Sequence, residues 1–354
     1  MKNKNITIVG AGGRVLKEVL PVLERIKFIN LNQIITAKSK KKINFEGIYS
    51  SKIITTNNLE EISLNDIDIL YIAVPCNQIY SVLKRLITSE YIKDIHLLID
   101  TPPLHPLLIF KLGLFRKFKS ANVLEDYIYN DIFLLTRKLM IASIGKLKNI
   151  NFQHSGFKYH AFAVVRKFFK IKGFYLIKKN VFTPIYSIIK IYKNFQISSI
   201  IEPRDYNIGR ILFVGNNGII SNFLNLRSEV NNSFVIKNNI EGNTYKGFSF
   251  FNNETEILKK EIEPVELQKD LKYRNLEIYN INKSKAIENY FVDFIQKIND
   301  GSINNSALYS IEDAFYDNFA SYFLDKFGLF FDIPLFFNGD TLIYKIIEII
   351  KSKF

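Results

Sequence analysis

Residues 5–13 read NITIVGAGG, a short β-branched strand that runs directly into a glycine turn. From Val15 to Leu23, apolar side chains then recur at helical spacing. A strand, a glycine turn and a helix in this order predict the start of a βαβ unit, with the turn at the carboxyl end of the strand.

Further along the chain the alternation continues. Apolar runs at residues 33–37, 68–74 and 96–99 predict three more strands, and helix-compatible stretches fall at residues 58–64 and 77–87. Parallel neighbours need a crossover connection, so this order predicts a doubly wound, mostly parallel α/β sheet. Ligands of such sheets bind outside the carboxyl ends of the strands.

The length and the cysteine content limit the class of protein. A chain of 354 residues is long enough for two domains, each with its own core. The single cysteine, Cys76, cannot form an internal disulfide, which suits a reducing cytoplasm. The most lipid-like stretch, residues 104–115, is interrupted by His105 and Lys111, so we expect no membrane span. The residues before the glycine turn are too short an apolar run for a signal peptide.

The chain is strongly basic: 48 Lys and Arg residues against 34 Asp and Glu residues give a net charge of +14. Such an excess attracts nucleic acid, anionic lipid or small anions. The composition, with 31 Phe, 19 Tyr and no Trp, is also that of a chain encoded by AT-rich codons. We therefore treat most of the charge as background and expect no nucleic-acid partner. The densest basic cluster is Lys38 to Lys42.

The glycine turn is the first feature with chemistry attached. In a dinucleotide-binding turn the first glycine makes the bend and the second lets the backbone approach the pyrophosphate, roles that Gly10 and Gly12 fit. The third glycine of the G-x-G-x-x-G motif is Val15 here. The alternative is an ordinary tight turn between a strand and a helix.

The end of the second predicted strand distinguishes the two nicotinamide dinucleotides. A carboxylate there would bind the ribose 2′-hydroxyl of NADH, whereas this chain has Lys38 and Ser39, which suit the 2′-phosphate of NADPH. NADP is therefore favoured over NAD. The alternative is that the basic run is a solvated loop.

Six segments in order carry a family resemblance. They are ITIVGAGG, DIDILYIAVPCNQIY, IHLLIDTPP, NVLEDYIYND and, further on, GRILFVGNNGIISN, with SIEDAFYDNFA near the end. This order resembles the Gfo/Idh/MocA family of NAD(P)-dependent oxidoreductases. In that family the third strand is followed by a Pro and an Asn, matched by Pro75 and Asn77, and the fourth ends in E-K-P, matched by Asp100, Thr101 and Pro102.

The resemblance implies an α/β plus α+β architecture. A Rossmann dinucleotide-binding domain would occupy residues 1–122, and an α+β substrate-binding domain with a large open mixed or antiparallel sheet would occupy residues 123–354. Alternating β-branched and aromatic runs between Val181 and Asn253 agree with such a sheet. In relatives the sheet often supports oligomer contacts, so we expect a homo-oligomer, either a dimer or a tetramer.

The resemblance also assigns site residues. The expected cofactor-binding residues are Gly10, Gly12, Gly13, Arg14, Lys38, Ser39, Pro75, Asn77, Asp100, Thr101 and Pro102.

Catalysis is where the chain departs from the family. Thr101 stands in place of the catalytic lysine, and Gly156 in place of the aspartate of a later D-x-x-x-H motif whose histidine is matched by His160. Histidine suits acid–base chemistry because its pKa lies near neutrality. His154 is the alternative if the alignment shifts by a turn.

Two side chains near these positions can replace the lysine. Lys158 adjoins His160, and Tyr127 lies on a segment that lines the active site in relatives, so either can polarise a carbonyl. Tyr129 and Tyr159 are further candidates, and the alternative for all these aromatics is simple packing. His105 is a candidate proton donor, because family members of the thiazolinyl imine reductase type also lack the lysine and carry a similar stretch. The expected catalytic residues are thus His160, Tyr127, Lys158 and His105.

Other chemistries find no support. The chain has no C-x-x-C or H-E-x-x-H motif and no tight His/Asp cluster, so we expect no metal site, and it lacks the motifs of serine hydrolases and P-loop NTPases. Glu312 and Asp313 fit the start of a helix, and His96 fits the interior of a strand. Three functions remain: a sugar or sugar-nucleotide oxidoreductase, an imine reductase, and an inactive dinucleotide-binding protein.

Overall fold

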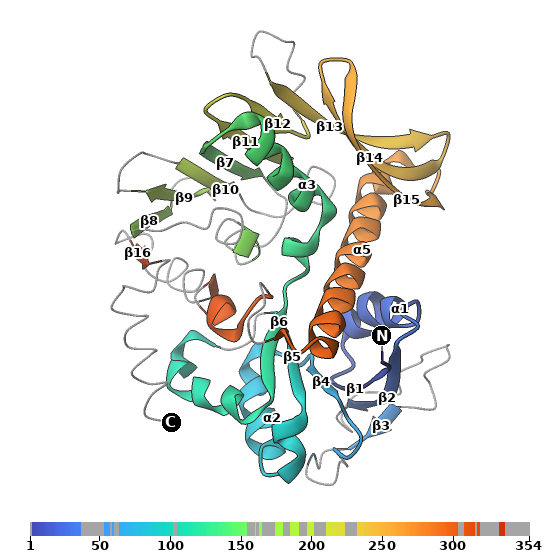
Figure 1. Ribbon diagram of the computed structural model, residues 1–354, viewed down its shortest axis with the longest axis vertical. Coiled ribbons are helices and arrows are strands. Elements are labelled where there is room, and N and C mark those ends of the chain that lie inside the picture. Colours follow the sequence, from blue (N-terminus) through green and yellow to red (C-terminus); the bar gives the residue numbers. More distant parts are fainter. Residues whose placement is uncertain are drawn as a thin grey trace. The chain divides into compact units, whose positions relative to one another are not determined.

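The computed structural model of the chain describes residues 2–36, 53–56, 59, 64–101, 105–153, 160, 163–164, 174–179, 185–190, 197–201, 210–223, 232–303, 308–315, 317–318 and 333–336. The chain forms two compact units, each with its own sheet (Figure 1). The first unit draws on Met1–Asp126, Ser284–Phe319 and Ile346–Phe354, and the second on Tyr127–Lys283 and Ala320–Lys345. The predicted division at residue 122 into a cofactor part and a substrate part stays a prediction about their roles.

The first unit is built on a six-stranded sheet in the order β3-β2-β1-β4-β5-β6. Every pair of neighbours is parallel. This is the order of the doubly wound dinucleotide-binding fold, whose ligand crevice opens between β1 and β4, where the direction of winding reverses. The strands are β1 (Lys4–Val9), β2 (Ile29–Thr36), β3 (Ile53–Thr55), β4 (Ile69–Ile72), β5 (His96–Asp100) and β6 (Ser120–Leu124).

The predicted strands of the N-terminal third are confirmed, with shifted ends. The second strand begins earlier than predicted, at Ile29, and two strands, β3 and β6, had no prediction. Central strands are buried on both faces, so they read as unbroken apolar runs such as Ile69–Ile72, all of it fully buried. The basic cluster at residues 38–42 lies outside the described residues.

The helix after the glycine turn contains a π-helical stretch, Val15–Val19 (η1), before α1 (Leu20–Leu23). Pro21 explains this local widening, because it has no N–H to donate to the residue 17 carbonyl and its ring would clash there. The Leu20 N–H instead bonds the Val15 carbonyl. Between β4 and β6, the described helices of this unit are α2 (Cys76–Leu86) and the 3₁₀ segments at Glu90–Asp94 and Pro106–Lys117.

The long helix α5 (Leu271–Asn299) contributes to both units. Its C-terminal part packs in the first unit, where the rings of Phe291 and Tyr71 meet edge to face with centroids 6.3 Å apart. Its N-terminal part packs in the second unit, where Ile278 joins a buried cluster with Tyr245 and Leu267. Apolar burial therefore fixes each part of the helix separately.

A short helix follows from Ile311, as the sequence predicts for Glu312 and Asp313. Its first turn is capped reciprocally: the Ser310 hydroxyl accepts from the Asp313 N–H at 3.0 Å, and the Asp313 carboxylate accepts from the Ser310 N–H at 3.4 Å. The two acidic residues are thus helix-start residues rather than a catalytic pair.

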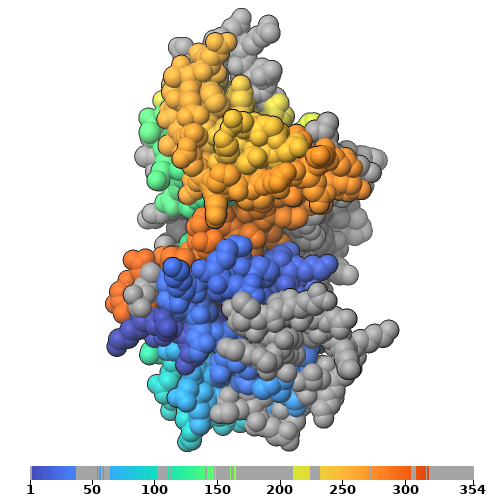
Figure 2. Space-filling model, turned by 90° about the vertical axis from the view of Figure 1, so that its right-hand side faces the viewer, coloured from blue at the N-terminus to red at the C-terminus, as the bar shows by residue number. Residues whose placement is uncertain are grey.

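The second unit is built on a ten-stranded mixed sheet in the order β15-β14-β13-β12-β11-β7-β10-β9-β8-β16. Two neighbouring pairs, β7 with β10 and β12 with β13, are parallel. The predicted sheet is confirmed, and it begins before the region from which it was predicted. Figure 2 shows β13 to β15 as a continuous yellow-to-orange surface.

The strands of this sheet are β7 (Leu147–Gln153), β8 (Phe174–Lys179), β9 (Ile185–Lys190), β10 (Ile197–Ile201), β11 (Arg210–Gly215), β12 (Ile219–Ser221), β13 (Ser233–Glu241), β14 (Thr244–Asn252), β15 (Thr255–Glu266) and β16 (Ile333–Phe336). The helical segments are the 3₁₀ turn Asp126–Tyr129, α3 (Asp131–Leu139) and the π segment Met140–Ile144. The predicted strand-turn-strand at residues 209–222 is β11 and β12, which pair antiparallel.

Among the described residues, no helix combines the length and the apolar composition that a membrane span needs. Within the same ranges, no three His, Cys, Asp or Glu side chains are grouped so that they would hold a metal ion.

Candidate functional site

Gly10 is fixed by its neighbours in the sheet. Its φ of +111° is a conformation that other residues rarely adopt, and a Cβ at this position would lie 2.3 Å from the Ala73 carbonyl oxygen. The Gly10 N–H also donates to the Ile35 carbonyl at 2.8 Å. The bend at the end of β1 therefore lies in close contact with the ends of β2 and β4, and only glycine fits at position 10.

Gly12 and Gly13 differ from Gly10. A Cβ at either position would meet nothing within 4 Å, and neither has a positive φ. The fold itself thus sets no requirement for glycine at these two positions. Open backbone at the start of a helix, with N–H groups that have no partner within the helix, suits the close approach of a phosphate group.

A cavity of about 400 Å³ opens at the carboxyl ends of β1, β2 and β4. We call it the first cavity. It includes Gly10 at its glycine-turn end, and one face of α2 forms a wall. The lining residues are Val9, Gly10, Ile35, Thr36, Thr56, Leu59, Ala73, Val74, Pro75, Gln78, Ser81, Val82 and Arg85. This is the edge of the sheet where a doubly wound fold binds a nucleotide, so the residues present fit the adenosine half of a dinucleotide.

Arg14, one residue after the glycine turn, is held by three carboxylates. Its Nε donates to Asp100 at 2.7 Å, and its two terminal nitrogens lie 2.9 Å from Glu18 and from Asp126. The Asp126 side chain is 1% exposed. The network ties the helix after β1 to the ends of β5 and β6, at the same edge of the sheet as the first cavity.

The charged groups of this network shift one another's pKa values. Burial raises the pKa of Asp100, and Arg14 opposes that shift. Burial alone would lower the pKa of Arg14, but Asp126 and Asp100 together raise it well above its ordinary value. The hydroxyl of Tyr71 is buried beside them, and burial followed by the Asp100 charge raises its pKa. Arg14 therefore remains a cation whose charge is matched by this chain's own carboxylates.

In the second unit, two expected catalytic residues lie in contact. The rings of Tyr127 and His160 stack with centroids 4.6 Å apart and planes 11° apart. Both side chains are buried, at 8% and 9% exposure. The Tyr127 hydroxyl lies 2.5 Å from the hydroxyl of Tyr279 on α5. This places one imidazole and two phenol groups in one cluster, which we call the tyrosine–histidine cluster.

The remaining expected residues are distributed as follows. Pro75 and Asn77 are exposed at the start of α2, with Pro75 also lining the first cavity, and Thr101 and His105 are half-buried. The positions that lie outside the described residues are Lys38, Ser39, Pro102, His154, Gly156, Lys158 and Tyr159.

Two other titratable side chains belong to the structure rather than to a reaction. His96 is buried in β5 and bonds the Ser120 hydroxyl at 2.8 Å, as its strand position predicts. Burial raises the pKa of the Cys76 thiol to about 11, which makes it a poor nucleophile.

Sequence reasoning missed Arg85, Asp126 and Tyr279 as site residues. Asp126 was visible next to a glutamate in a segment with a family counterpart, but its pairing with Arg14 bridges 112 positions. Tyr279 bonds a residue 152 positions away. Arg85 reads as one of two basic residues at the end of a helix, where the macrodipole alone accounts for them.

Comparisons with known proteins support the fold. No family model and no curated protein matches the chain. An oxidoreductase from Thermotoga maritima is 14% identical, with a TM-score of 0.60 over 95% of this chain and 99% of that one. A scyllo-inositol dehydrogenase from Lactobacillus casei is 14% identical, with a TM-score of 0.58 over 92% and 96%.

A third similar structure is named as a repressor. The super-repressor mutant of Gal80p from Saccharomyces cerevisiae is 10% identical, with a TM-score of 0.62 over 95% of this chain and 99% of that one. At these identities the likeness concerns the fold. The expected fold, a Rossmann-type domain followed by a mixed-sheet domain as in the Gfo/Idh/MocA oxidoreductases, is confirmed at that level.

Proposed function

We propose that this protein is an NADP-dependent oxidoreductase of the Gfo/Idh/MocA type. The observation that carries the proposal is the first cavity at the switch point of a sheet ordered β3-β2-β1-β4-β5-β6, with Gly10 at its turn. The similar structures named as an oxidoreductase and a dehydrogenase support an oxidoreductase function.

The proposed substrate is a sugar, a sugar nucleotide or a related small carbonyl or hydroxyl compound. One similar fold is named as a dehydrogenase of scyllo-inositol, a cyclic polyol. A bound nicotinamide dinucleotide would supply or accept the hydride at its nicotinamide C4.

The chain's own residues have separate roles in the proposal. Gly10 and Gly12 would let the backbone reach the pyrophosphate, and Lys38 and Ser39 would face the 2′-phosphate. His160 would give or take the proton that accompanies hydride transfer, with Tyr127 stacked on its ring. Lys158 or Tyr127 would polarise the substrate oxygen in place of the family lysine, at whose position Thr101 stands.

A second candidate function is non-catalytic dinucleotide binding, with a regulatory role. It is favoured by Thr101 and Gly156 in place of two family catalytic residues. The likeness to a protein named as a repressor mutant points the same way.

Calorimetric titration with NADPH and with NADH, followed by turnover assays on carbonyl, polyol and cyclic imine panels, tests the proposal. We expect NADPH to bind and one panel to show turnover. Binding of neither nucleotide would overturn the oxidoreductase function. Tight binding without turnover on any panel would favour the regulatory function.

A further inference from the structure

A cavity of about 580 Å³ lies at the opposite edge of the first sheet from the first cavity. We call it the basal cavity. Its lining comes from two connections, residues 87–93 between α2 and β5 and residues 116–118 before β6. Because β5 and β6 are parallel, both connections lie at the amino ends of the strands, whereas the first cavity lies at the carboxyl ends. The five residues of β5 span roughly 13 Å between these edges, so the basal cavity is separate from the proposed cofactor site.

Hydrogen bonds fix the two connections that form the walls. The Lys119 N–H donates to the Ile95 carbonyl at 3.0 Å, which joins one connection to the other. On the first connection, the Ser89 N–H donates to the Leu86 carbonyl at 3.2 Å, and the Ser89 hydroxyl accepts from the Tyr91 N–H at 3.4 Å. The basal cavity is thus bounded by hydrogen-bonded turns.

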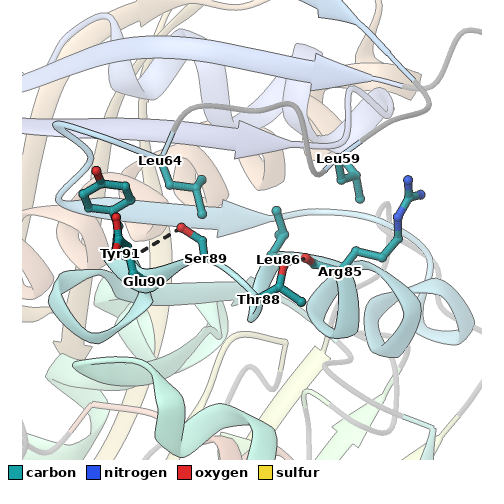
Figure 3. A pocket seen from close by; sticks show the side chains of 8 residues that line it. All are labelled: Leu59, Leu64, Arg85, Leu86, Thr88, Ser89, Glu90 and Tyr91. Carbon is teal, nitrogen blue, oxygen red and sulfur yellow. Dashed lines mark hydrogen bonds between the residues drawn. The ribbon is translucent and has the colours of Figure 1, made fainter.

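A smaller neighbour, the second cavity of about 320 Å³, shares Ser89 and Glu90 with the basal cavity. Figure 3 shows Glu90 and Tyr91 at one end of the second cavity and Leu59 and Arg85 at the other, with the Ser89–Tyr91 bond dashed. Among the described residues that line the second cavity there is no lysine, and Arg85 already interacts with another group of the chain. Of these two neighbours, the basal cavity is therefore the one whose lining suits an anion.

The floor of the basal cavity is apolar. Ile92 and Phe118 are 2% and 5% exposed, and Ile87, which lines the same cavity, is half-buried. An apolar ring or chain that covers these side chains gains binding free energy in proportion to the apolar area that it removes from water.

Charged side chains form the exposed part of the lining. Lys93, Lys117 and Arg116 are exposed cations, against one carboxylate, that of Glu90. Arg116 already interacts with another group of the chain, so the argument depends on the two lysines. In the part of the chain that the structure describes, neither of these lysine ammonium groups forms an ion pair. Two lysine ammonium groups thus remain to bind an anion above an apolar floor.

The electrostatics of His96 agree with a positive edge of the sheet. His96 begins β5 at the same edge as the basal cavity, and Lys119 directly follows the Phe118 of its floor. Burial, followed by the charges of Lys119 and Lys4, lowers the pKa of His96 to about 4, while Asp68 opposes the shift. A positive potential of this kind favours an anionic ligand.

We infer that the basal cavity binds a phosphate monoester that carries an apolar ring or chain. At pH 7 such a phosphate has a charge of about −1.5 to −2, which two ammonium groups match, whereas a carboxylate has only one charge. Lysine binds phosphate as a point charge and needs no fixed bidentate geometry. The apolar part of the ligand would cover Ile92 and Phe118. The inference goes beyond the proposed function, because this site lies at the other edge of the sheet.

Calorimetric titration with phenyl phosphate, inorganic phosphate and phenol tests the inference. Phenyl phosphate has both parts of the expected ligand, and the other two compounds have one part each. We expect phenyl phosphate to bind at least about fivefold more tightly than inorganic phosphate, because of the apolar floor. It should also bind at least about fivefold more tightly than phenol, because of the two lysines.

Two double variants locate the binding. Lys93→Gln/Lys117→Gln removes both cations from the basal cavity, whereas Lys27→Gln/Lys84→Gln removes two exposed lysines of the same unit that do not line it. We expect the first pair to weaken phenyl phosphate binding at least about tenfold and the control pair less than about twofold. Glu90→Gln should tighten binding about two- to threefold, because it removes the carboxylate of the lining. Thermal unfolding without ligand shows whether each variant is folded.

Several results would overturn the inference. One is no binding of phenyl phosphate to the unmodified protein up to about 10 mM, and another is equal affinity for both double variants. Equal affinity for phenyl phosphate and inorganic phosphate would contradict the role of the apolar floor. Where NADPH binds, saturating NADPH should leave the affinity for phenyl phosphate within about twofold, and competition would assign the phosphate to the cofactor site instead.

Discussion

Tyr127 and His160 stack in parallel, with 4.6 Å between their ring centroids, while the Tyr127 hydroxyl bonds that of Tyr279 at 2.5 Å. One ring thus supports the imidazole and is itself held by α5. Removing either hydroxyl of this largely buried pair costs free energy, because the remaining hydroxyl loses this hydrogen bond.

A double-mutant cycle measures this bond. Tyr127→Phe and Tyr279→Phe should each lower the free energy of unfolding by about 1 kcal/mol, and the double variant should lose little more than either single one. Urea denaturation gives the three values. Strictly additive losses would mean that the two hydroxyls do not stabilise each other.

The two glycines of the turn should respond differently to the same change. Gly10→Ala places a Cβ against the Ala73 carbonyl at a positive φ, so we expect a loss of about 3 kcal/mol in unfolding free energy. Gly12→Ala meets nothing within 4 Å and should change stability by less than about 0.5 kcal/mol.

Gly12→Ala should nevertheless weaken NADPH binding at least about tenfold, since the added methyl group would stand between the backbone and the pyrophosphate. Calorimetric titration of the folded variant checks this. Unchanged affinity would show that the turn serves the fold alone.

His96 should make the protein less stable in mild acid. Burial, followed by the charges of Lys119 and Lys4, lowers its pKa to about 4. The unfolded value is about 6.5, so between these pH values the unfolded chain binds the extra proton. Stability from this group is complete above about pH 6.5 and is lost as the pH falls towards 4.

Comparison of the protein with His96→Asn at pH 7 and pH 4.5 isolates that contribution. We expect the unmodified protein to lose roughly 2 kcal/mol more than the variant between the two conditions. Urea denaturation at both pH values provides the measurement. Parallel losses would show that His96 titrates normally in the folded protein.

Arg14→Met should lower the stability of the protein, because the carboxylates of Asp100 and Asp126 would lose the Arg14 cation. Arg14→Met removes the cation between Asp100 and the buried Asp126, which costs about 3 kcal/mol at pH 7 if both stay ionised. Burial already raises the pKa of Asp100, so without Arg14 the folded state takes up a proton more readily. The deficit should therefore shrink between pH 7 and pH 5.

Asp100→Asn in the Arg14→Met background is the matched test. Removing one unpaired charge should restore part of the lost stability at pH 7 and remove much of the pH dependence. If the double variant is less stable than Arg14→Met at pH 7, charge pairing is not the source of the effect.

Local signals in the sequence predicted the first sheet because its strands are short, apolar and separated by turns. The fully buried run Ile69–Ile72 and the glycine bend after Val9 can each be recognised from a few consecutive residues. The early start of β2 was missed, since Asn30 and Asn32 break the apolar run at positions that the sheet leaves exposed. Strand β3 was missed because it is only three residues long, Ile53–Thr55.

The site was harder to predict because its contacts join distant positions. Arg14 follows a recognisable turn, yet nothing near it in the sequence indicates Asp100 or Asp126 as partners. Likewise, Tyr279 lies among many aromatic residues on α5, and only packing singles it out. The strand order β3-β2-β1-β4-β5-β6, which sets where these groups meet, also depends on pairing between distant segments.

His160→Asn and His105→Asn separate the candidate reactions once a substrate is found. If His160 moves the proton, its variant should lose about 10²- to 10⁴-fold in kcat and the corresponding limb of the pH–rate profile, with NADPH affinity unchanged. His105→Asn should then keep nearly full activity. The reverse pattern would assign the proton to His105, as the imine reductase hypothesis requires. If both variants keep full activity, neither histidine is the acid or base, and a tyrosine hydroxyl such as that of Tyr127 becomes the proton donor to test.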